Sequence, residues 1–200
     1  EDYEDQLDEE GKDYLKEIQR GAHRMTRLID DLLSLSRVSR IRNPYEQVSI
    51  GELIETVLER IEFDVKEGDV DLRMQEDLPT VICDRIKLGE VFLNLINNAI
   101  KFSSKDNPER PRVAIGGKKV KGGYEFFVQD NGIGIDPQFH DQVFDLFKRL
   151  HAEKDYDGTG AGLSIVKRII EDHQGRVWIE SELGKGSIFH FFLPDTLKIK

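Results

Sequence analysis

The chain has 200 residues, which is enough for one domain with its own core and a smaller attachment, because single domains most often have roughly 100 to 150 residues. Its formal net charge of −10 argues against a nucleic-acid-binding protein, which would need clustered Lys and Arg to neutralise phosphates. Cys83 is the single cysteine, so an internal disulfide is excluded. No apolar run reaches the roughly 20 residues that cross a bilayer, so we expect a soluble, cytoplasmic chain. A membrane segment upstream in the full-length protein is left open.

The first predicted element is a long helix over residues 9–41. Apolar residues recur in it at alternating spacings of three and four, which is the pattern of a helix packed against another helix. This seam consists of Leu15, Ile18, Ala22, Met25, Ile29 and Leu32. Asn43 and Pro44 end the helical pattern, so we divide the chain into an N-terminal segment, residues 1–43, and a second domain, residues 44–200.

The second domain alternates helix and strand signals, which favours an α/β or α+β fold. The predicted helices cover residues 52–65, 84–103 and 162–173, and the predicted strands cover residues 81–83, 113–115, 124–130, 176–181 and 188–193. Residues 107–112 and 116–123 carry turn chemistry. We expect Cys83 to be a small core residue.

The predicted helix over residues 84–103 has one polar face. Its members share a narrow arc of the helix, opposite an apolar face, and are Glu90, Asn94, Asn97, Asn98 and Lys101. A solvated surface would account for Lys and Glu, but asparagine is a poor helix former, and three of them in mid-helix cost stability. Amide oxygens suit a hard cation such as Mg²⁺, which also binds substrate phosphates. The stripe therefore favours a functional site.

The predicted strand that ends at Asp130 places a carboxylate on its core side. Asp130 has the same side-chain parity as Phe126 and Val128, so it needs a donor that offsets its desolvation, and the exocyclic amino group of a bound base could supply one. The turn that follows contains Gly132 and Gly134, which let the backbone turn sharply and approach a ligand. A polar strand end followed by an ordinary glycine turn gives the same pattern, and the residues alone leave both interpretations open.

Glycines also precede the predicted helix over residues 162–173. The run over residues 158–162 would present backbone N–H groups and the positive end of the helix dipole to phosphates. It is not a GxxxxGK[ST] loop, and the chain contains none, which excludes the usual P-loop NTPases. The polar stretch before it is not the apolar strand of a dinucleotide fingerprint. A flexible loop capped by a helix is the alternative.

With these three features in this order in one domain, the chain resembles the catalytic, ATP-binding domain of two-component sensor histidine kinases, within the gyrase, Hsp90, kinase and MutL (GHKL) ATPase group. Five segments carry the resemblance: residues 94–103 (N box), 130–135 (first glycine box), 144–147 (F box), 158–163 (second glycine box) and 184–187 (third glycine box). Residues 28–38 and 147–151 are most similar to phytochrome-like kinases. The resemblance implies a two-layer α/β sandwich of the Bergerat type, with helices over a mixed sheet, and makes residues 1–43 the second helix of a dimerisation hairpin.

The resemblance also implies roles for individual residues. Asn94 and Asn98 would hold Mg²⁺ against the ATP phosphates, with Lys101 nearby. Asp130 would accept a hydrogen bond from the adenine amino group. Glu90 matches the acidic position proposed to act as a base on the acceptor histidine, so Glu90 and Asn94 are the predicted catalytic residues. The other predicted ATP contacts lie in the glycine boxes and in the lid between them: Gly132, Gly134, Ile135, Lys148, Arg149, Thr159, Gly160, Ala161, Gly162, Leu163 and Ser187.

One part of the family pattern is missing from the sequence. The family's phosphoacceptor histidine is followed by an acidic residue and, shortly after, by a proline, whereas His23 is followed by Arg24 and Met25. We therefore predict that the chain is truncated before the phosphoacceptor helix or lacks it. The acceptor would be a histidine-bearing hairpin helix from upstream in the same protein or from a partner protomer. The resemblance further implies a response regulator as partner and a homodimer in the full-length protein.

The predicted function is that of a sensor histidine kinase catalytic domain, which binds Mg·ATP and transfers the γ-phosphoryl group to a histidine mainly by positioning and charge neutralisation. A nucleotide-binding pseudokinase or scaffold without transfer is the alternative. A clamping ATPase of the gyrase or Hsp90 kind is a third interpretation, and it would need additional transducing domains.

Overall fold

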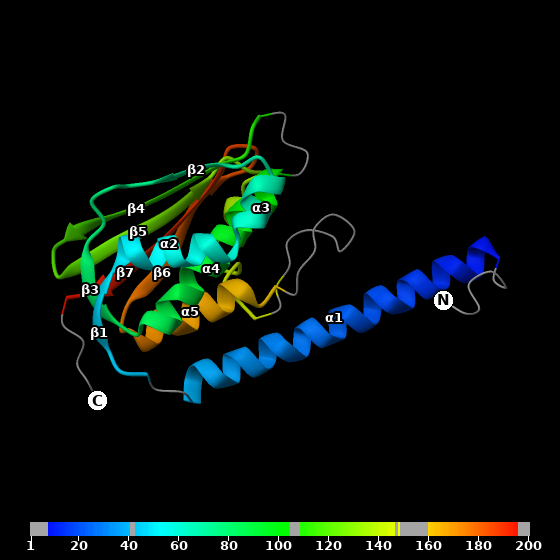
Figure 1. The fold of residues 1–200 in the computed structure, drawn as a ribbon, viewed down its shortest axis with the longest axis horizontal. Coiled ribbons are helices and arrows are strands. Elements are labelled where there is room, and N and C mark those ends of the chain that lie inside the picture. Colours follow the sequence, from blue (N-terminus) through cyan, green and yellow to red (C-terminus); the bar gives the residue numbers. More distant parts are fainter. Residues whose placement is uncertain (1–7, 41–42, 105–108, 147, 149–159, 196–200) are drawn as a thin grey trace.

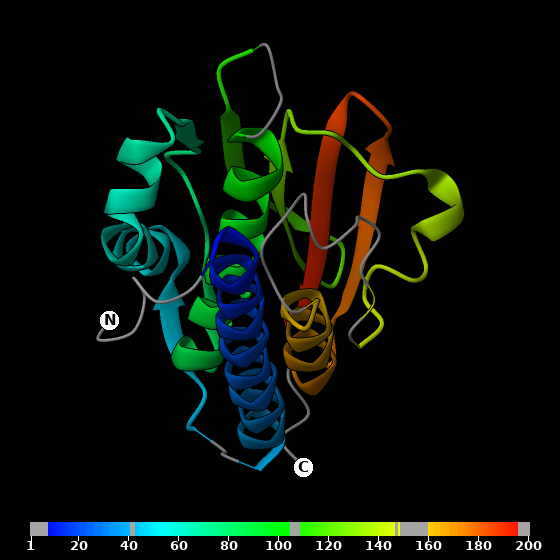
Figure 2. The same ribbon diagram turned by 90° about the vertical axis from the view of Figure 1, so that its right-hand side faces the viewer.

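The computed structural model describes residues 8–40, 43–104, 109–146, 148 and 160–195. Its first helix, α1 (Glu9–Arg40), is a single rod of 32 residues that contacts α5 (Gly162–Asp172) and extends beyond the rest of the fold at its N-terminal end (Figures 1 and 2). Asp8 begins it by accepting a hydrogen bond from the Gly11 backbone N–H at 2.8 Å. The predicted long helix is thus confirmed over the described residues. None of the described helices is long and apolar enough to cross a bilayer.

A mixed five-stranded sheet is the centre of the second domain. Its strand order is β2-β4-β5-β7-β6, in which β2 and β4 are parallel and the other neighbours are antiparallel. The strands are β2 (Asp71–Met74), β4 (Arg112–Val120), β5 (Gly123–Asp130), β6 (Arg176–Glu182) and β7 (Gly186–Pro194). A separate antiparallel pair joins β1 (Glu46–Ser49) to β3 (Thr80–Cys83).

Helices cover one face of the five-stranded sheet, as Figures 1 and 2 show. The remaining helices are α2 (Ile50–Arg60), α3 (Glu62–Glu67), α4 (Arg85–Ser104) and the short 3-10 helix η2 (Pro137–Phe139). Both α4 and α5 lie against the sheet, and α2 packs on α4. The core between the layers is aromatic: the Phe92 ring of α4 lies edge-on to Phe126 of β5 and Phe191 of β7, at 6.2 and 5.4 Å. The predicted two-layer sandwich is confirmed.

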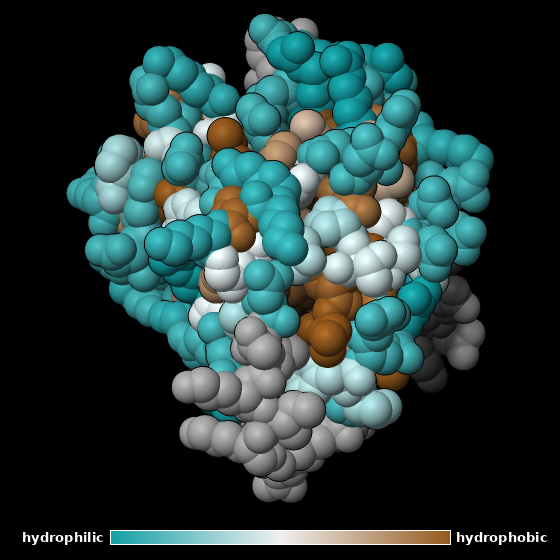
Figure 3. Space-filling view, turned by 90° about the vertical axis from the view of Figure 1, so that its left-hand side faces the viewer, coloured by the Kyte–Doolittle hydropathy of each residue, from teal (hydrophilic) through white to brown (hydrophobic). Residues whose placement is uncertain are grey.

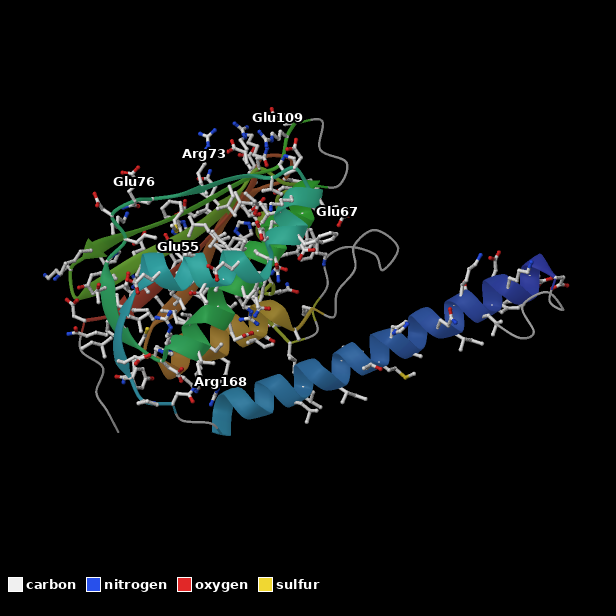
Figure 4. All side chains as sticks on the ribbon, viewed as in Figure 1. Glu55, Glu67, Arg73, Glu76, Glu109 and Arg168 are labelled. Atoms are coloured by element: carbon white, nitrogen blue, oxygen red, sulfur yellow. The ribbon has the colours of Figure 1, made fainter. Side chains whose placement is uncertain are left out.

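Polar side chains cover most of the outside of this domain. Glu55 and Glu76 are exposed and point away from the core (Figure 4). Figure 3 looks at the end of the molecule opposite the free end of α1 and shows a largely polar surface with separate apolar patches. The described part of α1 differs, because its apolar seam is exposed: Ile18, Met25 and Ile29 expose 66%, 62% and 58% of their surface.

The predicted helix over residues 52–65 is two helices in the structure. The chain breaks at Ile61, whose backbone leaves the helical region with φ −116° and ψ 17° while its side chain is buried at 4% exposure. The periodicity continues through the break, since α3 resumes one residue later, so the pattern alone did not reveal it.

The strand β4 runs through residues predicted to form a turn. Gly116 and Gly117 lie inside this strand, where a Cβ atom would come within 2.4 Å of the Phe127 ring and 2.5 Å of the Phe126 ring. These glycines therefore make room for aromatic rings on the neighbouring strand. The four-residue strands β1 and β2 were not predicted, because each is too short to show a clear alternation.

Candidate functional site

The asparagine helix and the second glycine box meet in the structure. Asn94 donates through its amide nitrogen to the Glu90 carbonyl oxygen at 2.8 Å, so its Oδ1 is turned away from its own helix. That oxygen lies 2.7 Å from where a Cβ atom on Gly162 would be. A side chain at the first residue of α5 would therefore displace the Asn94 amide, and glycine avoids this clash.

The other polar residues of α4 lie along the same face. Asn98 and Lys101 are half-buried, Asn97 is exposed, and the Lys101 ammonium lies 4.6 Å from the centre of the Phe102 ring. Glu90 forms an ion pair with Arg60 of α2, with 3.6 Å between Oε1 and Nη1. Sequence analysis missed Arg60, because its link to Glu90 depends on how α2 packs on α4.

Asp130 is a buried carboxylate, with 6% of its surface exposed. Its Oδ1 accepts hydrogen bonds from the backbone N–H groups of Gly132, at 2.8 Å, and Ser187, at 3.2 Å. The described residues supply no donor to Oδ2. Burial raises the pKa of Asp130 to about 6, although the two backbone donors act in the opposite direction. One carboxylate oxygen is thus held by two backbone donors, and the described residues leave the other without a donor.

The turn after Asp130 is fixed between α4 and the hairpin of β6 and β7. A Cβ atom on Gly132 would lie 2.4 Å from the Phe102 carbonyl oxygen, and one on Gly134 would lie 2.0 Å from the Glu182 carbonyl oxygen. Gly134 also has a φ of +67°, a backbone conformation that residues other than glycine adopt only at a cost in free energy. Both predicted glycines are therefore required by close backbone approach.

The remaining predicted contacts lie in two groups. At the start of α5, Ala161 is fully buried, Leu163 packs against the core, and Gly160 has a φ of +80°. In the segment after η2, Phe144 of the F box is buried, and exposed Lys148 donates to the Gln142 side chain at 2.7 Å. Arg149, Thr159 and Phe147 lie outside the described residues.

A divalent cation would find few carboxylates here. No group of three His, Cys, Asp or Glu side chains among the described residues could hold a metal ion. The donor set beside Gly162 is instead the Asn94 amide oxygen, with Asn98 one turn further along α4 and Glu90 one turn before. Such a set fits Mg²⁺, which binds through few protein oxygens together with substrate phosphates and waters.

The chain matches two family models. Residues 83–197 match the family described as "Histidine kinase-, DNA gyrase B-, and HSP90-like ATPase", and residues 1–40 match the "His Kinase A (phospho-acceptor) domain". The second match corrects our prediction that the phosphoacceptor helix is absent. That prediction depended on one short motif around the histidine, which says nothing about the rest of the helix. His23 is the single histidine within residues 1–40, and it is exposed on α1.

Two relatives are similar to this chain over most of its length. "Cyanobacterial phytochrome A" of Nostoc sp. (strain PCC 7120) is 40% identical over 192 residues, which are 96% of this chain and 25% of that protein. "Methanogenesis regulatory histidine kinase FilI" of Methanothrix harundinacea is 40% identical over 177 residues, which are 88% of this chain and 20% of that protein. The chain spans a quarter or less of the length of these two relatives.

Solved histidine kinase structures share the fold. Full-length ShkA in complex with AMPPNP has a TM-score of 0.74 and 27% identity, and the alignment covers 97% of this chain and 41% of that one. Histidine kinase ThkA in complex with the response regulator protein TrrA has a TM-score of 0.72 and 25% identity, and that alignment covers 98% of this chain and 55% of that one.

Proposed function

Since this chain belongs to the sensor histidine kinase family, we propose that its second domain binds Mg·ATP and transfers the γ-phosphoryl group to a histidine. The observation that carries the proposal is the buried Asp130 carboxylate, which keeps one oxygen unused by the described residues beside a rigid glycine turn. The amino group of adenine would donate to that oxygen and offset the desolvation of the carboxylate. Gly132, Gly134 and Ile135 would line the base.

The phosphates would lie between α4 and the start of α5. The backbone N–H groups at the first turn of α5 and its dipole favour negative charge, and Gly160, Ala161, Gly162 and Leu163 form that start. Asn94 and Asn98 would hold Mg²⁺, which neutralises phosphate charge when it is bound. Lys101, Lys148, Arg149 and Thr159 would contact the phosphates from α4 and from the segment between the glycine boxes.

Glu90 would act as the base for the acceptor. It lies one turn before Asn94 on α4, and its side chain is 40% exposed, so an imidazole can approach it from solvent. The ion pair with Arg60 at 3.6 Å holds the carboxylate on this side of the helix. During transfer the bond between the γ-phosphorus and the ADP oxygen would break, a phosphorus–nitrogen bond would form, and Glu90 would take the imidazole proton.

The N-terminal segment, residues 1–43, would supply the dimerisation helix, and residues 44–200 the catalytic domain. The exposed apolar seam of α1 supports a homodimer of the full-length protein, because such a seam requires a second helix. A response regulator would take the phosphoryl group from the histidine. Among the residues that match the phospho-acceptor domain, His23 is the histidine to test first.

Phosphotransfer can be tested with ATP labelled at the γ-phosphate. The chain is incubated with Mg·ATP alone and together with a separate phospho-acceptor hairpin, with His23→Gln, Glu90→Gln and Asn94→Ala as variants. We expect acid-labile, base-stable label on a histidine, reduced by roughly 100-fold or more in Glu90→Gln, because general bases contribute that much. Loss of label on the chain itself in His23→Gln would assign the acceptor to His23, and label confined to the hairpin would assign it there. ATP binding without label on either polypeptide would contradict transfer and leave the pseudokinase alternative.

A further inference from the structure

Three polar side chains lie in a row across the strands at the adenine end of the proposed site. Asp130 ends β5, Ser187 lies on β7 and Ser181 lies on β6, and these strands are neighbours in the sheet (Figure 2). Ser181 is paired directly with Ser187, and the pairing of Gln129 with Ile188 brings Asp130 next to Ser187. Because side chains directly opposite each other share a face of the sheet, the row lies on the helix-covered face, with the buried Ile179 and Phe189.

The Ser181 hydroxyl has three partners. It accepts a hydrogen bond from the Ile135 backbone N–H at 2.8 Å, it donates to the Gly186 carbonyl oxygen at 2.9 Å, and its oxygen lies 2.9 Å from the Ser187 hydroxyl oxygen. A hydroxyl has one proton and two lone pairs. The carbonyl can only accept and the N–H can only donate, so the Ser181 proton is committed to Gly186. The contact with Ser187 is therefore satisfied only if Ser187 donates.

This assignment uses the single proton of Ser187. The backbone N–H groups of Ser187 and Gly132 both donate to Asp130 Oδ1, and that of Ile135 donates to Ser181. Each of these donors is therefore spent inside the protein. The groups of this row that remain for a ligand are the second carboxylate oxygen of Asp130 and the lone pairs of the Ser187 hydroxyl, and all of them accept hydrogen bonds.

We propose that Ser181 is a positioning residue that fixes the Ser187 hydroxyl as an acceptor, so that the site selects 6-amino purines over 6-oxo purines. The inference rests on the proposed binding of ATP. A 6-amino group brings donors to these acceptors, whereas a 6-oxo group brings another acceptor and leaves both sides unpaired. Ser181 exerts this effect through Ser187 and need not touch the base.

The close packing around this row keeps the hydroxyls in place. A Cβ atom on Gly186 would lie 2.1 Å from the Asp130 carbonyl oxygen, and Gly184 donates through its N–H to the Ile133 carbonyl oxygen at 2.7 Å. Ser187 is buried, with 5% of its surface exposed. The Ser187 hydroxyl is therefore shielded from solvent, whereas Ser181 itself is half-buried.

The test compares Mg·ATP with Mg·ITP, which carries a 6-oxo purine on the same ribose and triphosphate, by titration calorimetry. In the unaltered chain we expect ATP to bind roughly 100-fold more tightly than ITP or better, since sites built on hydrogen bonds reject mismatched analogues strongly. In Ser181→Ala the Ser187 proton is released to face the 6-oxo group, and we expect the ratio of the two affinities to fall about tenfold. Weaker fixing of the turn at Ile135 would lower both affinities equally and cancel in the ratio.

Four further variants separate positioning from a structural role. Ser181→Thr keeps the hydroxyl and should restore the ratio. Thr56→Ala is the control, because that hydroxyl donates to the Glu52 carbonyl oxygen within α2, and the ratio should stay unchanged. In a Ser187→Ala background, Ser181→Ala should have no further effect on the ratio, because its target is gone.

Equal losses of ATP and ITP affinity in Ser181→Ala, with the ratio kept, would overturn the inference and leave Ser181 a structural residue. Equal affinities of the unaltered chain for ATP and ITP would overturn it as well. A chain that binds no ATP at all would instead contradict the proposed function, so the two failures are distinguishable.

Discussion

The turn after Asp130 and the helix α1 differ in how many of their groups are in contact with the rest of the chain. Around the turn, glycines meet backbone atoms of α4 and β6, and both donors beside Asp130 are used. Along the described part of α1, Ile18 and Met25 are mostly exposed. The comparison teaches that the described residues around the turn pack against one another, whereas the described part of α1 exposes apolar side chains at the spacing of a helix that packs against another helix.

The largest expected difference between the two regions is in core truncation. Phe126 is fully buried between the rings of Phe92 and Phe191, so Phe126→Ala should lower the free energy of unfolding by about 3 to 5 kcal/mol. Ile18→Ala should change it by no more than about 0.5 kcal/mol in the monomer, because its side chain is exposed. Urea denaturation at low protein concentration measures both, and similar losses in the two variants would break the comparison.

A smaller difference is expected between two glycines with positive φ. Gly134→Ala and Gly184→Ala should each cost about 1 to 2 kcal/mol for a left-handed backbone, since φ is +67° and +79°. The added Cβ meets the Glu182 carbonyl oxygen at Gly134 but open space at Gly184. Gly134→Ala should therefore lose roughly a further 1 to 3 kcal/mol and most of its ATP affinity. Equal melting temperatures and equal ATP affinities in the two variants would contradict a rigid turn.

The pH dependence of nucleotide binding sharpens the role of Asp130. Burial raises its pKa to about 6 in the folded chain, so the folded state binds this proton more tightly than the unfolded state does. The free energy of unfolding of the domain without nucleotide should therefore fall as pH rises from about 4 to about 6. Binding of ATP needs the charged form to accept from the amino group. The ratio of ATP to ITP affinity should therefore fall up to about tenfold for each pH unit below 6.

Calorimetry at pH 7.5 and pH 5 checks this prediction, and the shared triphosphate cancels its own titration. Asp130→Asn removes the titrating group and should give a ratio that does not change with pH. A ratio that is also constant in the unaltered chain would show that Asp130 does not contact the base.

The smallest expected effect is at Gly21 in α1. A Cβ atom there meets nothing within 4 Å, and the residue lies inside a long helix. Gly21→Ala should therefore stabilise α1 by about 0.5 to 1 kcal/mol, because glycine in mid-helix costs that much relative to alanine. Circular dichroism should show that Gly21→Ala keeps a higher helix content than the unaltered chain as the temperature is raised. A loss of helix content would mean that this position is packed, and α1 would no longer contrast with the turn.

The sequence revealed those parts of the site that depend on local periodicity. That Asn94 and Asn98 share one face of their helix follows from 3.6 residues per turn, and the inward direction of Asp130 follows from strand alternation. Cys83 is buried, as expected. The assigned ligand roles of these residues and the division of the chain at residues 43 and 44 stay predictions.

The parts that sequence analysis missed depend on contacts between distant segments. Arg60 reaches Glu90 only through the packing of α2 on α4, and Ser181 reaches Ser187 only through the register of β6 and β7. His173 is fully buried and accepts a hydrogen bond from the Asp84 backbone N–H at 3.1 Å, across 89 residues of the chain. No local pattern carries such information.

The most direct test of the account is a calorimetric titration of the chain with ATP, with and without Mg²⁺, beside the same titration of Asp130→Asn. The account predicts saturable binding that Mg²⁺ strengthens and that Asp130→Asn weakens by about tenfold or more, since a hydrogen bond to a charged group contributes about 1.5 to 3 kcal/mol. No binding of ATP, or equal binding by the two chains, would contradict the claim that the buried Asp130 carboxylate recognises adenine.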